Sequence, residues 1–169
     1  MPSNAIFLSI RPQYANKILE GTKTVELRRV RPKYMTEGAL ALIYVPSPIK
    51  SLVGAFKVDL VVKKPVQELW EIVHDKAGVT REEFDAYFDG TSIGVGIFFS
   101  NIWILPEPIE LQDLKEQMLG FQPPQGFRYA TASELASPQL VEFVEDTGAV
   151  VQWSLLDGKY QKPRRGLRT

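Results

Sequence analysis

Short apolar segments, some interrupted by glycine, alternate with short helical patterns along most of this chain, and this alternation constrains the fold more than any other feature. Strand patterns occupy residues 5–10, 24–29, 40–45, 52–62 and 92–104; most are apolar runs, and the second alternates apolar and polar residues. In the fourth run Gly54 predicts a bulge or bend, because a glycine inside a strand weakens regular pairing. Strands of this kind favour a small closed or nearly closed β-barrel over a doubly wound parallel sheet.

Helix signals lie between these strand segments. Apolar residues recur at helical spacing in three stretches, 13–20, 66–74 and 111–118. Pro12 stands where a proline opens a helix, Thr80 begins a capping box, and further helical signals start at Thr131 and Ser137. We therefore expect an α+β protein in which about five to six strands form a small barrel and short helices pack around its rim.

The composition excludes several classes of protein. The chain has no cysteine and one histidine, so we expect no disulfide, no metal site and no cofactor. No apolar run approaches ~18 residues and no signal-peptide pattern opens the chain, which predicts a soluble, cytoplasmic protein without membrane contact. We expect one domain over residues 1–157, with a helical extension from about residue 131, and a basic, flexible tail over 158–169.

The formal net charge of zero hides a segregation of charge along the chain. Residues 1–64 hold 11 basic and 4 acidic side chains, residues 65–157 hold 4 basic and 16 acidic ones, and the last twelve residues hold 5 basic and none acidic. Charge divided in this way predicts a positive face on the molecule. The alternative is that the folded chain mixes these blocks in space and cancels the field.

The most informative short segment is Gly-x-Lys-x-x-Glu-x-Arg at residues 21–28. Gly21 ends the preceding helix, and from Thr24 the pattern alternates, which places Glu26 and Arg28 on one face of a strand. An exposed ion pair on such a strand contributes only about 0–1 kcal/mol, whereas in a partly dry pocket the carboxylate orients the guanidinium toward a ligand. We favour the pocket; the alternative is a structural ion pair that closes the barrel.

Basic and aromatic side chains around this segment indicate a nucleic-acid ligand. Several cationic residues close to it would neutralise phosphates: Lys17, Lys23, Arg28, Arg29, Arg31 and Lys33. Aromatic residues at loops or strand ends would stack bases: Tyr34, Tyr44, Phe127 and Tyr129. For any single ring among these, a place in the core is the more frequent alternative.

Ser-Ile-Arg-Pro at residues 9–12, followed by Ile-Leu-Glu-Gly-Thr-Lys-Thr-Val-Glu-Leu-Arg at residues 18–28, resembles the signature of the ASCH domain (activating signal cointegrator homology). The segments 43–48 and 53–56 are similar to its barrel strands, and Pro-Pro-Gln-Gly-Phe-Arg-Tyr at residues 123–129 is similar to a segment of prokaryotic members. The resemblance covers most of the first 130 residues. It implies a PUA-like β-barrel, a fold that binds RNA or modified nucleotides.

The resemblance also implies a site. By position, Lys23, Glu26 and Arg28 would line a cleft, with Ser47 from a neighbouring strand end. Some relatives hydrolyse an acylated cytidine with a lysine and a threonine; Lys23 matches that lysine, but Glu26 stands at the threonine position and is a weak amide nucleophile. Other relatives are reported as ribonucleases, for which Lys23 and Glu26 would be the acid and the base. Further candidates for ligand contact are Arg11, Lys17, Arg29, Tyr44 and Tyr129.

Three functions remain open from the sequence. The first, which we favour, is a module that binds RNA or a nucleotide, with DNA as an alternative ligand: Arg28 would contact phosphate or a base edge, Lys23 would add positive charge, and Glu26 would accept from a base amino group. The second is a hydrolase of RNA or of acylated nucleosides that uses Lys23 and Glu26 in the same cleft. The third is a protein-interaction domain that uses the acidic middle region.

Overall fold

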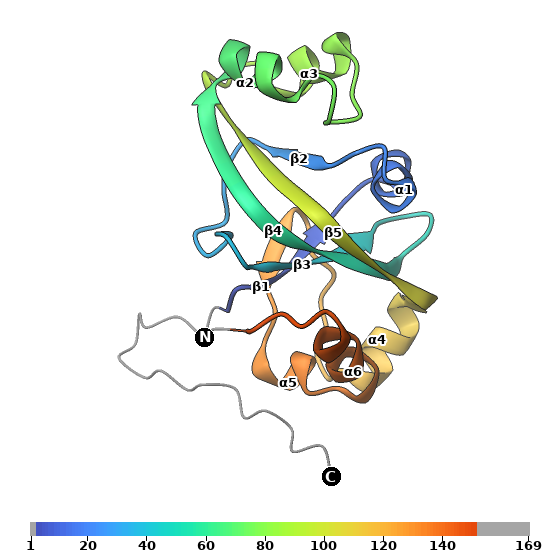
Figure 1. Cartoon of the computed structure of the whole chain (residues 1–169). Coiled ribbons are helices and arrows are strands. Elements are labelled where there is room, and N and C mark those ends of the chain that lie inside the picture. Colours follow the sequence, from blue (N-terminus) through green and yellow to red (C-terminus); the bar gives the residue numbers. More distant parts are fainter. Residues whose placement is uncertain (1–2, 152–169) are drawn as a thin grey trace.

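A curled sheet of six strands forms the centre of the molecule (Figure 1), in a computed structural model that describes residues 3–151. The strands are β1 (Ala5–Ser9), β2 (Val25–Arg28), β3 (Leu40–Val45), β4 (Ser51–Pro65), β5 (Ile93–Glu110) and β6 (Phe127–Tyr129). They lie in the order β2-β5-β4-β3-β1-β6, and every neighbouring pair is antiparallel except β1 and β3. Because β2 and β6 remain at the two edges, the sheet is a half-barrel, which confirms the predicted α+β class with a barrel-like sheet. The predicted basic tail lies outside the described residues.

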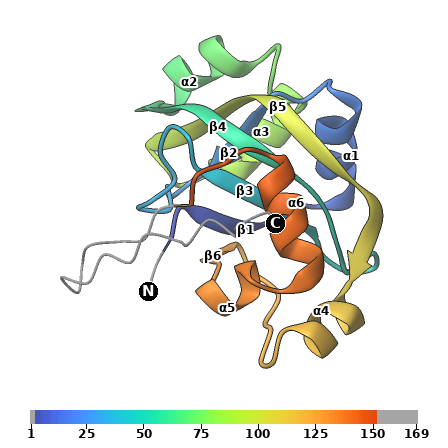
Figure 2. The ribbon, with the colours of Figure 1, turned by 60° about the horizontal axis from the view of Figure 1, so that its bottom comes forward.

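Short helices surround this sheet. They are α1 (Pro12–Glu20), α2 (Val66–Val73), α3 (Arg81–Tyr87), α4 (Leu111–Gln117), α5 (Ala132–Leu135) and α6 (Pro138–Asp146). The helices α2 and α3 lie together at one end of the sheet and α4, α5 and α6 at the other, while α1 lies to the side of β2 (Figures 1 and 2). The capping box predicted at Thr80 is present, and Thr131 forms another; each hydroxyl accepts from the backbone N–H of the glutamate three residues further on.

The strands β4 and β5 are longer than the sequence pattern predicts, at 15 and 18 residues. Their register shifts beside Gly54, as the predicted bulge requires. β5 continues past its predicted end at Ile104 through Pro106 and Pro108. Pairing with β4 is interrupted there and resumes at Ile109, because proline has no N–H to donate to a neighbouring strand.

Apolar side chains form three clusters on the two faces of the sheet. The inner cluster draws on β1, β3, β4, β5 and α1, and includes Ile97. One outer cluster lies under α4, α5 and α6 and includes Phe7 and Tyr44. A second outer cluster lies under α2 and α3 and includes Val25 and Leu27. The core is therefore split by the sheet into an inside, closed by α1, and an outside covered at each end by helices.

Glycine allows α2 and α3 to approach β5 closely. A Cβ atom placed on Gly94 would lie 2.7 Å from a ring carbon of Phe88 and 2.8 Å from a methyl carbon of Leu69. Both neighbours are buried in the cluster under α2 and α3. A larger residue at this position would push the two helices away from the sheet.

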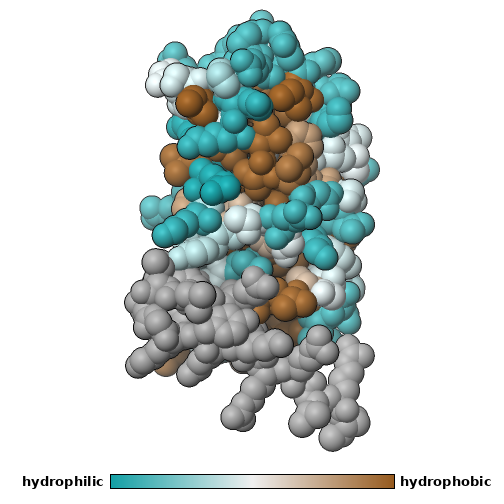
Figure 3. Space-filling view, turned by 60° about the vertical axis from the view of Figure 1, so that its left-hand side comes forward, coloured by the Kyte–Doolittle hydropathy of each residue, from teal (hydrophilic) through white to brown (hydrophobic). Residues whose placement is uncertain are grey.

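The surface of the described part of the chain includes an apolar area. Hydrophobic residues gather in the upper half of the face seen in Figure 3. Exposed apolar side chains include Leu60, which pairs with Phe98 across β4 and β5, and Val30, which follows β2; they are 54% and 70% exposed. None of the helices within residues 3–151 is long and apolar enough to cross a bilayer.

Candidate functional site

Glu26 and Arg28 project from β2 onto the inner face of the sheet, as the alternating pattern predicts. Their partners on β5 are Ile97 and Val95, which both belong to the inner cluster. Residues directly opposite each other in an antiparallel pair share a face. The two charged side chains therefore face the interior of the half-barrel along its β2 edge.

The guanidinium of Arg28 joins the two edges of the half-barrel. Its Nη2 donates to the carbonyl of Ser9 at the end of β1 (3.0 Å), and its Nη1 donates to the carbonyl of Gly126 just before β6 (3.3 Å). We call this meeting of β2 with the ends of β1 and β6 the seam. Oε1 of Glu26 lies 3.8 Å from Nε of Arg28, close enough for an ion pair but too far for a hydrogen bond. Both terminal nitrogens of Arg28 thus donate to backbone carbonyls, and its Nε has no hydrogen-bond partner among the described residues. The contact with phosphate or a base edge stays a prediction.

One carboxylate oxygen of Glu26 has no hydrogen-bond partner among the described residues. Oε1 accepts from the backbone N–H of Leu27 at 3.1 Å, whereas Oε2 is buried and accepts from none of them. The whole residue is 7% exposed. A buried acceptor left unpaired is unfavourable by about 1–3 kcal/mol, and by more when it is charged. Oε2 is therefore the atom of the seam best suited to accept a hydrogen bond from a ligand.

Lys23 lies beneath the loop that joins α2 to α3 and is only 2% exposed. Its Nζ donates to the carbonyl of Ala77 at 2.5 Å and lies 5.5 Å from the centre of the Tyr14 ring. Burial lowers the pKa of Lys23 below 10.5, while the negative charge of Glu26 opposes this shift. A lysine whose pKa is lowered releases a proton more readily near neutral pH than a solvated lysine does.

Hydrogen bonds from α1 and from the start of β2 fasten the α2–α3 loop over Lys23. Nζ of Lys17 donates to the carbonyl of Gly78 at 2.7 Å, and the backbone N–H of Thr24 donates to the carbonyl of Lys76 at 2.9 Å. Gly78 has a φ of +66°, and a Cβ there would lie 3.1 Å from Cβ of Lys23. Glycine therefore suits both the backbone turn and the close approach. Lys17, a predicted ligand residue, holds this loop in place.

Tyr14 on α1 and Glu83 on α3 lie next to Lys23 and link the two helices. The hydroxyl of Tyr14 donates to Oε2 of Glu83 at 2.5 Å. Burial, together with this hydrogen bond and the charge of Glu83, raises the pKa of Tyr14 to about 12. The same hydrogen bond lowers the pKa of Glu83. The phenol therefore stays protonated at neutral pH and acts as a hydrogen-bond donor rather than as a base.

Tyr87, the last residue of α3, borders the seam from the other side. Its carbonyl accepts from Nε of Arg29 at 2.6 Å, and the Arg29 guanidinium lies 4.6 Å from the centre of its ring. Burial raises the pKa of Tyr87, the positive charge of Arg28 opposes this shift, and the negative charge of Glu26 adds to it. The phenol of Tyr87 thus interacts electrostatically with both Glu26 and Arg28. Arg29 contacts the ring and the backbone carbonyl of the same residue.

The remaining predicted ligand residues lie in different settings. Arg11 is exposed just before α1, and Ser47 is exposed in the turn between β3 and β4. Tyr129 on β6 is half-buried, and its hydroxyl accepts from the backbone N–H of Tyr34 at 3.2 Å. Tyr44 is 2% exposed within the outer cluster under α4, α5 and α6. Contrary to the prediction, the Tyr44 ring offers no surface to a ligand, because it packs in the core on the face of the sheet opposite the seam.

Sequence reasoning did not assign Tyr14, Glu83, Tyr87 or Gly126 to the site. In the sequence Glu83 is visible only as a capping residue, and Tyr87 only as an apolar position on its helix. Glu83 does cap α3, and its second oxygen binds Tyr14 as well. The sequence lacks a signal for these residues because their places depend on contacts between distant segments. No local pattern indicates that Tyr14 of α1 binds Glu83 of α3, or that β6 pairs with β1.

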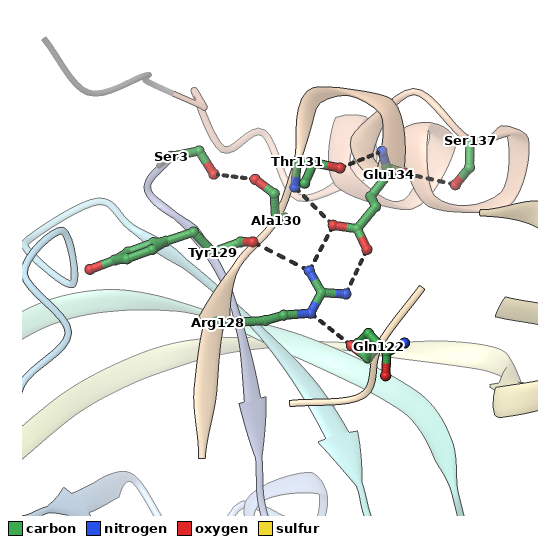
Figure 4. A network of polar contacts seen from close by, with 8 residues as sticks. All are labelled: Ser3, Gln122, Arg128, Tyr129, Ala130, Thr131, Glu134 and Ser137. Carbon is green, nitrogen blue, oxygen red and sulfur yellow. Dashed lines mark hydrogen bonds and ion pairs between the residues drawn. The ribbon is translucent and has the colours of Figure 1, made fainter. Parts of the chain in front are cut away.

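A second, partly buried charge pair lies on the other side of β6 and joins the helical extension to the sheet (Figure 4). Arg128 donates to both carboxylate oxygens of Glu134, at 2.8 and 2.6 Å, and to the carbonyl of Gln122 at 2.7 Å. Its guanidinium also lies over the rings of Phe7 and Phe121, 4.7 and 4.9 Å from their centres. Every part of this pair is engaged by the protein itself, so we assign it a structural role.

Two further observations concern other kinds of site. Within residues 3–151, no group of three or more acidic or histidine side chains lies together as a metal site would require. An open hollow of about 630 Å³ lies between the β3–β4 turn and α4. Its lining residues are Pro48, Ile49, Lys50, Glu110, Leu111, Gln112, Lys115 and Glu116. None of the residues of the 21–28 segment lines it.

The geometry defines a class: an α+β half-barrel with a bridging arginine and a carboxylate with one unpaired oxygen at its seam, and a buried lysine just before β2. Comparison with known proteins gives the family. The sequence matches the ASCH domain over residues 8–118, and the chain belongs to this family.

Individual relatives agree with this assignment. A protein of Zymomonas mobilis subsp. mobilis named "ASCH domain-containing ribonuclease" is 32% identical over 127 residues, which is 75% of this chain and 84% of the relative. The crystal structure of ASCH from Zymomonas mobilis superposes with a TM-score of 0.75 and 30% identity, covering 82% of this chain and 94% of that one. The N-terminal domain of Staphylothermus marinus McrB, at 11% identity and a TM-score of 0.52, shares the fold alone; it covers 86% of this chain and 95% of that domain.

Proposed function

We propose that this protein binds RNA at the seam and cleaves its phosphodiester backbone by attack of the ribose 2′-oxygen, with Glu26 as the base and Lys23 as the acid. Two findings support the proposal. A 32% identical relative is named a ribonuclease. The observation that carries it is the buried, unpaired Oε2 of Glu26 in the neighbourhood of a lysine whose pKa is lowered by burial. Because a relative is named a ribonuclease, we prefer cleavage of RNA to binding alone as the proposed function.

The chemistry follows from the ribose 2′-hydroxyl, which is a hydrogen-bond donor that DNA lacks. Oε2 of Glu26 accepts the 2′-hydroxyl proton as the 2′-oxygen attacks the adjacent phosphorus. The bond between phosphorus and the 5′-oxygen of the next nucleotide breaks, and that oxygen takes a proton from the Lys23 ammonium. The products are a 2′,3′-cyclic phosphate and a free 5′-hydroxyl. Arg28 and Lys23 place positive charge near the phosphate as negative charge develops on it.

The same geometry sets a condition on substrate entry. Because Oε2 of Glu26 is out of contact with solvent, a ribose reaches it only when a neighbouring side chain moves. The half-buried phenols of Tyr14 and Tyr87 both interact electrostatically with Glu26, and we propose that these are the side chains that move. Displacement of Tyr14 breaks its side-chain hydrogen bond to the exposed Glu83.

The test uses a short RNA with a fluorophore and a quencher, and a DNA of the same sequence. Wild-type protein is expected to cleave the RNA and not the DNA, and mass spectrometry is expected to find the cyclic phosphate end. Glu26→Gln keeps the shape of the side chain but cannot take the proton, so the rate should fall about 10²- to 10⁴-fold. The matched control is Glu20→Gln, an exposed residue at the end of α1, which should cleave at the wild-type rate.

Circular dichroism and thermal unfolding of each variant establish that the fold is intact. Wild-type protein that leaves RNA uncut, or a folded Glu26→Gln variant that cleaves at the wild-type rate, contradicts the proposal. If the protein binds RNA with an affinity that falls as the salt concentration rises, but does not cleave it, the function is that of an RNA-binding module.

A further inference from the structure

Two aromatic residues of β6 face the same side of the sheet as Glu26 and Arg28. Leu8 on β1 lies opposite Phe127, and Ile6 lies opposite Tyr129. Both Leu8 and Ile6 belong to the inner cluster, and Tyr129 packs against it. Because cross-strand neighbours share a face, Phe127 and Tyr129 project to the inner side, while Arg128 between them projects outward to Glu134.

These rings lie directly beside the seam. The carbonyl that accepts from Nη1 of Arg28 belongs to Gly126, the residue before Phe127. The backbone N–H of Ser9 donates to the same carbonyl at 2.8 Å, so the start of β6 is held by both β1 and β2. Phe127 therefore follows directly after the residue that binds Arg28, the neighbour of Glu26 on the inner face.

The rings form a continuous row that ends in a cation. The centres of Phe127 and Tyr129 lie 6.0 Å apart, and those of Tyr129 and Tyr34 lie 5.4 Å apart. Nζ of Lys33 lies 5.7 Å from the centre of the Tyr34 ring. Tyr129 is fixed by the backbone N–H of Tyr34, whereas Phe127 is 37% exposed. Phe127 thus presents an open ring that rests against a fixed one.

This arrangement matches the chemistry of one kind of ligand. An exposed aromatic ring beside cations offers a nucleobase a surface on which to stack, and the cations interact with the phosphates that flank it. A single exposed apolar residue usually needs no explanation. Here the ring of Phe127 adjoins the charged residues of the seam. Lys33 lies at the other end of the row and Arg31 is close to it in sequence, and both are exposed.

We propose that Phe127, supported by Tyr129, is a subsite that stacks a nucleobase of the nucleotide next to the one held at Glu26. The proposal rests on the proposed function, because it takes RNA as the ligand of the seam. Stacking on Phe127 strengthens binding of the ground state and of the transition state alike. Its loss raises KM and leaves kcat nearly unchanged.

The test measures coupling between one base and one ring. The probe is a series of six-nucleotide RNAs with 2′-amino groups in place of the 2′-hydroxyls, each carrying 2-aminopurine at a different position. The 2′-amino group still donates a hydrogen bond to Oε2 of Glu26 but resists cleavage by attack on the adjacent phosphorus. Wild-type protein should quench the fluorescence of one position most strongly. Phe127→Leu should remove that quenching and weaken binding about 5- to 150-fold. Phe98→Leu, a half-buried phenylalanine in the outer cluster under α2 and α3, is the matched control and should bind as wild type does.

An abasic nucleotide at the quenched position completes the test. Wild type and Phe127→Leu should bind the abasic RNA equally, because no base remains to stack. Phe127→Trp, which keeps a ring, should retain the quenching; this also covers the case in which Phe127→Leu folds poorly. Equal binding of the complete RNA by wild type and a folded Phe127→Leu overturns the proposal, as does a loss of affinity that persists with the abasic RNA.

These outcomes are separate from those of the proposed function. If wild type fails to cleave RNA but the coupling between base and ring is found, the subsite stands and the hydrolase assignment fails. If Glu26→Gln abolishes cleavage but Phe127→Leu leaves both KM and base quenching unchanged, the subsite alone fails.

Discussion

Replacing Glu134 by leucine should destabilise the protein by about 3 kcal/mol. The substitution removes charge-assisted hydrogen bonds of 2.8 and 2.6 Å from Arg128 and one of 2.9 Å from the backbone N–H of Thr131. Removing one partner of a buried ion pair costs about 3–5 kcal/mol, because the other charge is left unpaired. We use the lower end of this range because the Arg128 side chain is 26% exposed and keeps the carbonyl of Gln122.

Thermal and urea unfolding followed by circular dichroism measure this loss. For a chain of 169 residues, a change of this size lowers Tm by about 6–12 °C. The double variant Arg128→Met/Glu134→Leu should recover part of the stability, since it leaves no unpaired charge. The control is the exposed pair of Arg81 and Asp85, at 3.1 Å, for which Asp85→Leu should change stability by less than about 1 kcal/mol.

The pH dependence of unfolding gives an independent measurement of the same pair. Burial by itself raises the pKa of Glu134, but the hydrogen bonds from Arg128 and from the backbone of Thr131 outweigh it and leave the pKa below 4.5. A carboxyl group with a lower pKa in the folded state stabilises that state above its unfolded pKa, and this contribution is lost as the pH falls through the folded pKa. The difference between wild type and Glu134→Leu should therefore shrink below pH 4.5. A difference under about 1 kcal/mol at pH 7, or one that acid leaves unchanged, would refute the reasoning.

Two further substitutions test the site and the packing around it. Lys23→Met should abolish RNA cleavage, and cleavage at the wild-type rate would contradict the proposed role. The variant leaves the carbonyl of Ala77 without its donor, which costs about 1–3 kcal/mol, and loss of an ammonium that burial disfavours offsets part of this; a loss of more than ~3 kcal/mol in urea unfolding would make Lys23 structural. Gly94→Ala places a methyl group against Phe88 and Leu69 and should cost about 1–3 kcal/mol in the same assay, whereas Gly126→Ala, which has open space around it, should cost under ~1 kcal/mol; equal effects would contradict the packing argument.

The sequence predicts those parts of the fold that depend on local pattern. Alternation places Glu26 and Arg28 on one face of β2, and the structure agrees because a strand has a period of two residues. The capping box at Thr80 is likewise local, since all of its partners lie within one turn. The bulge beside Gly54 follows from the missing side chain. In each case the physical cause acts over a few residues and can be read from them.

The parts that the sequence did not predict depend on contacts between distant segments. β6 has only three residues, and its pairing with β1 brings Gly126 to the seam. Lys23 precedes the strand pattern, so its burial depends on Ala77 and the loop that covers it. The run of β3 is apolar throughout and all six of its residues are buried, so Tyr44 is covered by α4, α5 and α6 on a face that the pattern alone leaves unassigned. None of these outcomes follows from local periodicity.

The two charge pairs of this protein resemble each other in composition but differ in what they leave unsatisfied. Both carboxylate oxygens of Glu134 accept from Arg128, and the pair is complete without a ligand. At the seam, the guanidinium of Arg28 is turned toward backbone carbonyls, so the neighbouring Glu26 keeps one oxygen that no described residue satisfies. A pair kept only to close the half-barrel would gain stability by satisfying that oxygen, as the other pair does. The unpaired oxygen is better explained as a binding atom whose cost in stability is offset when a ligand donates to it.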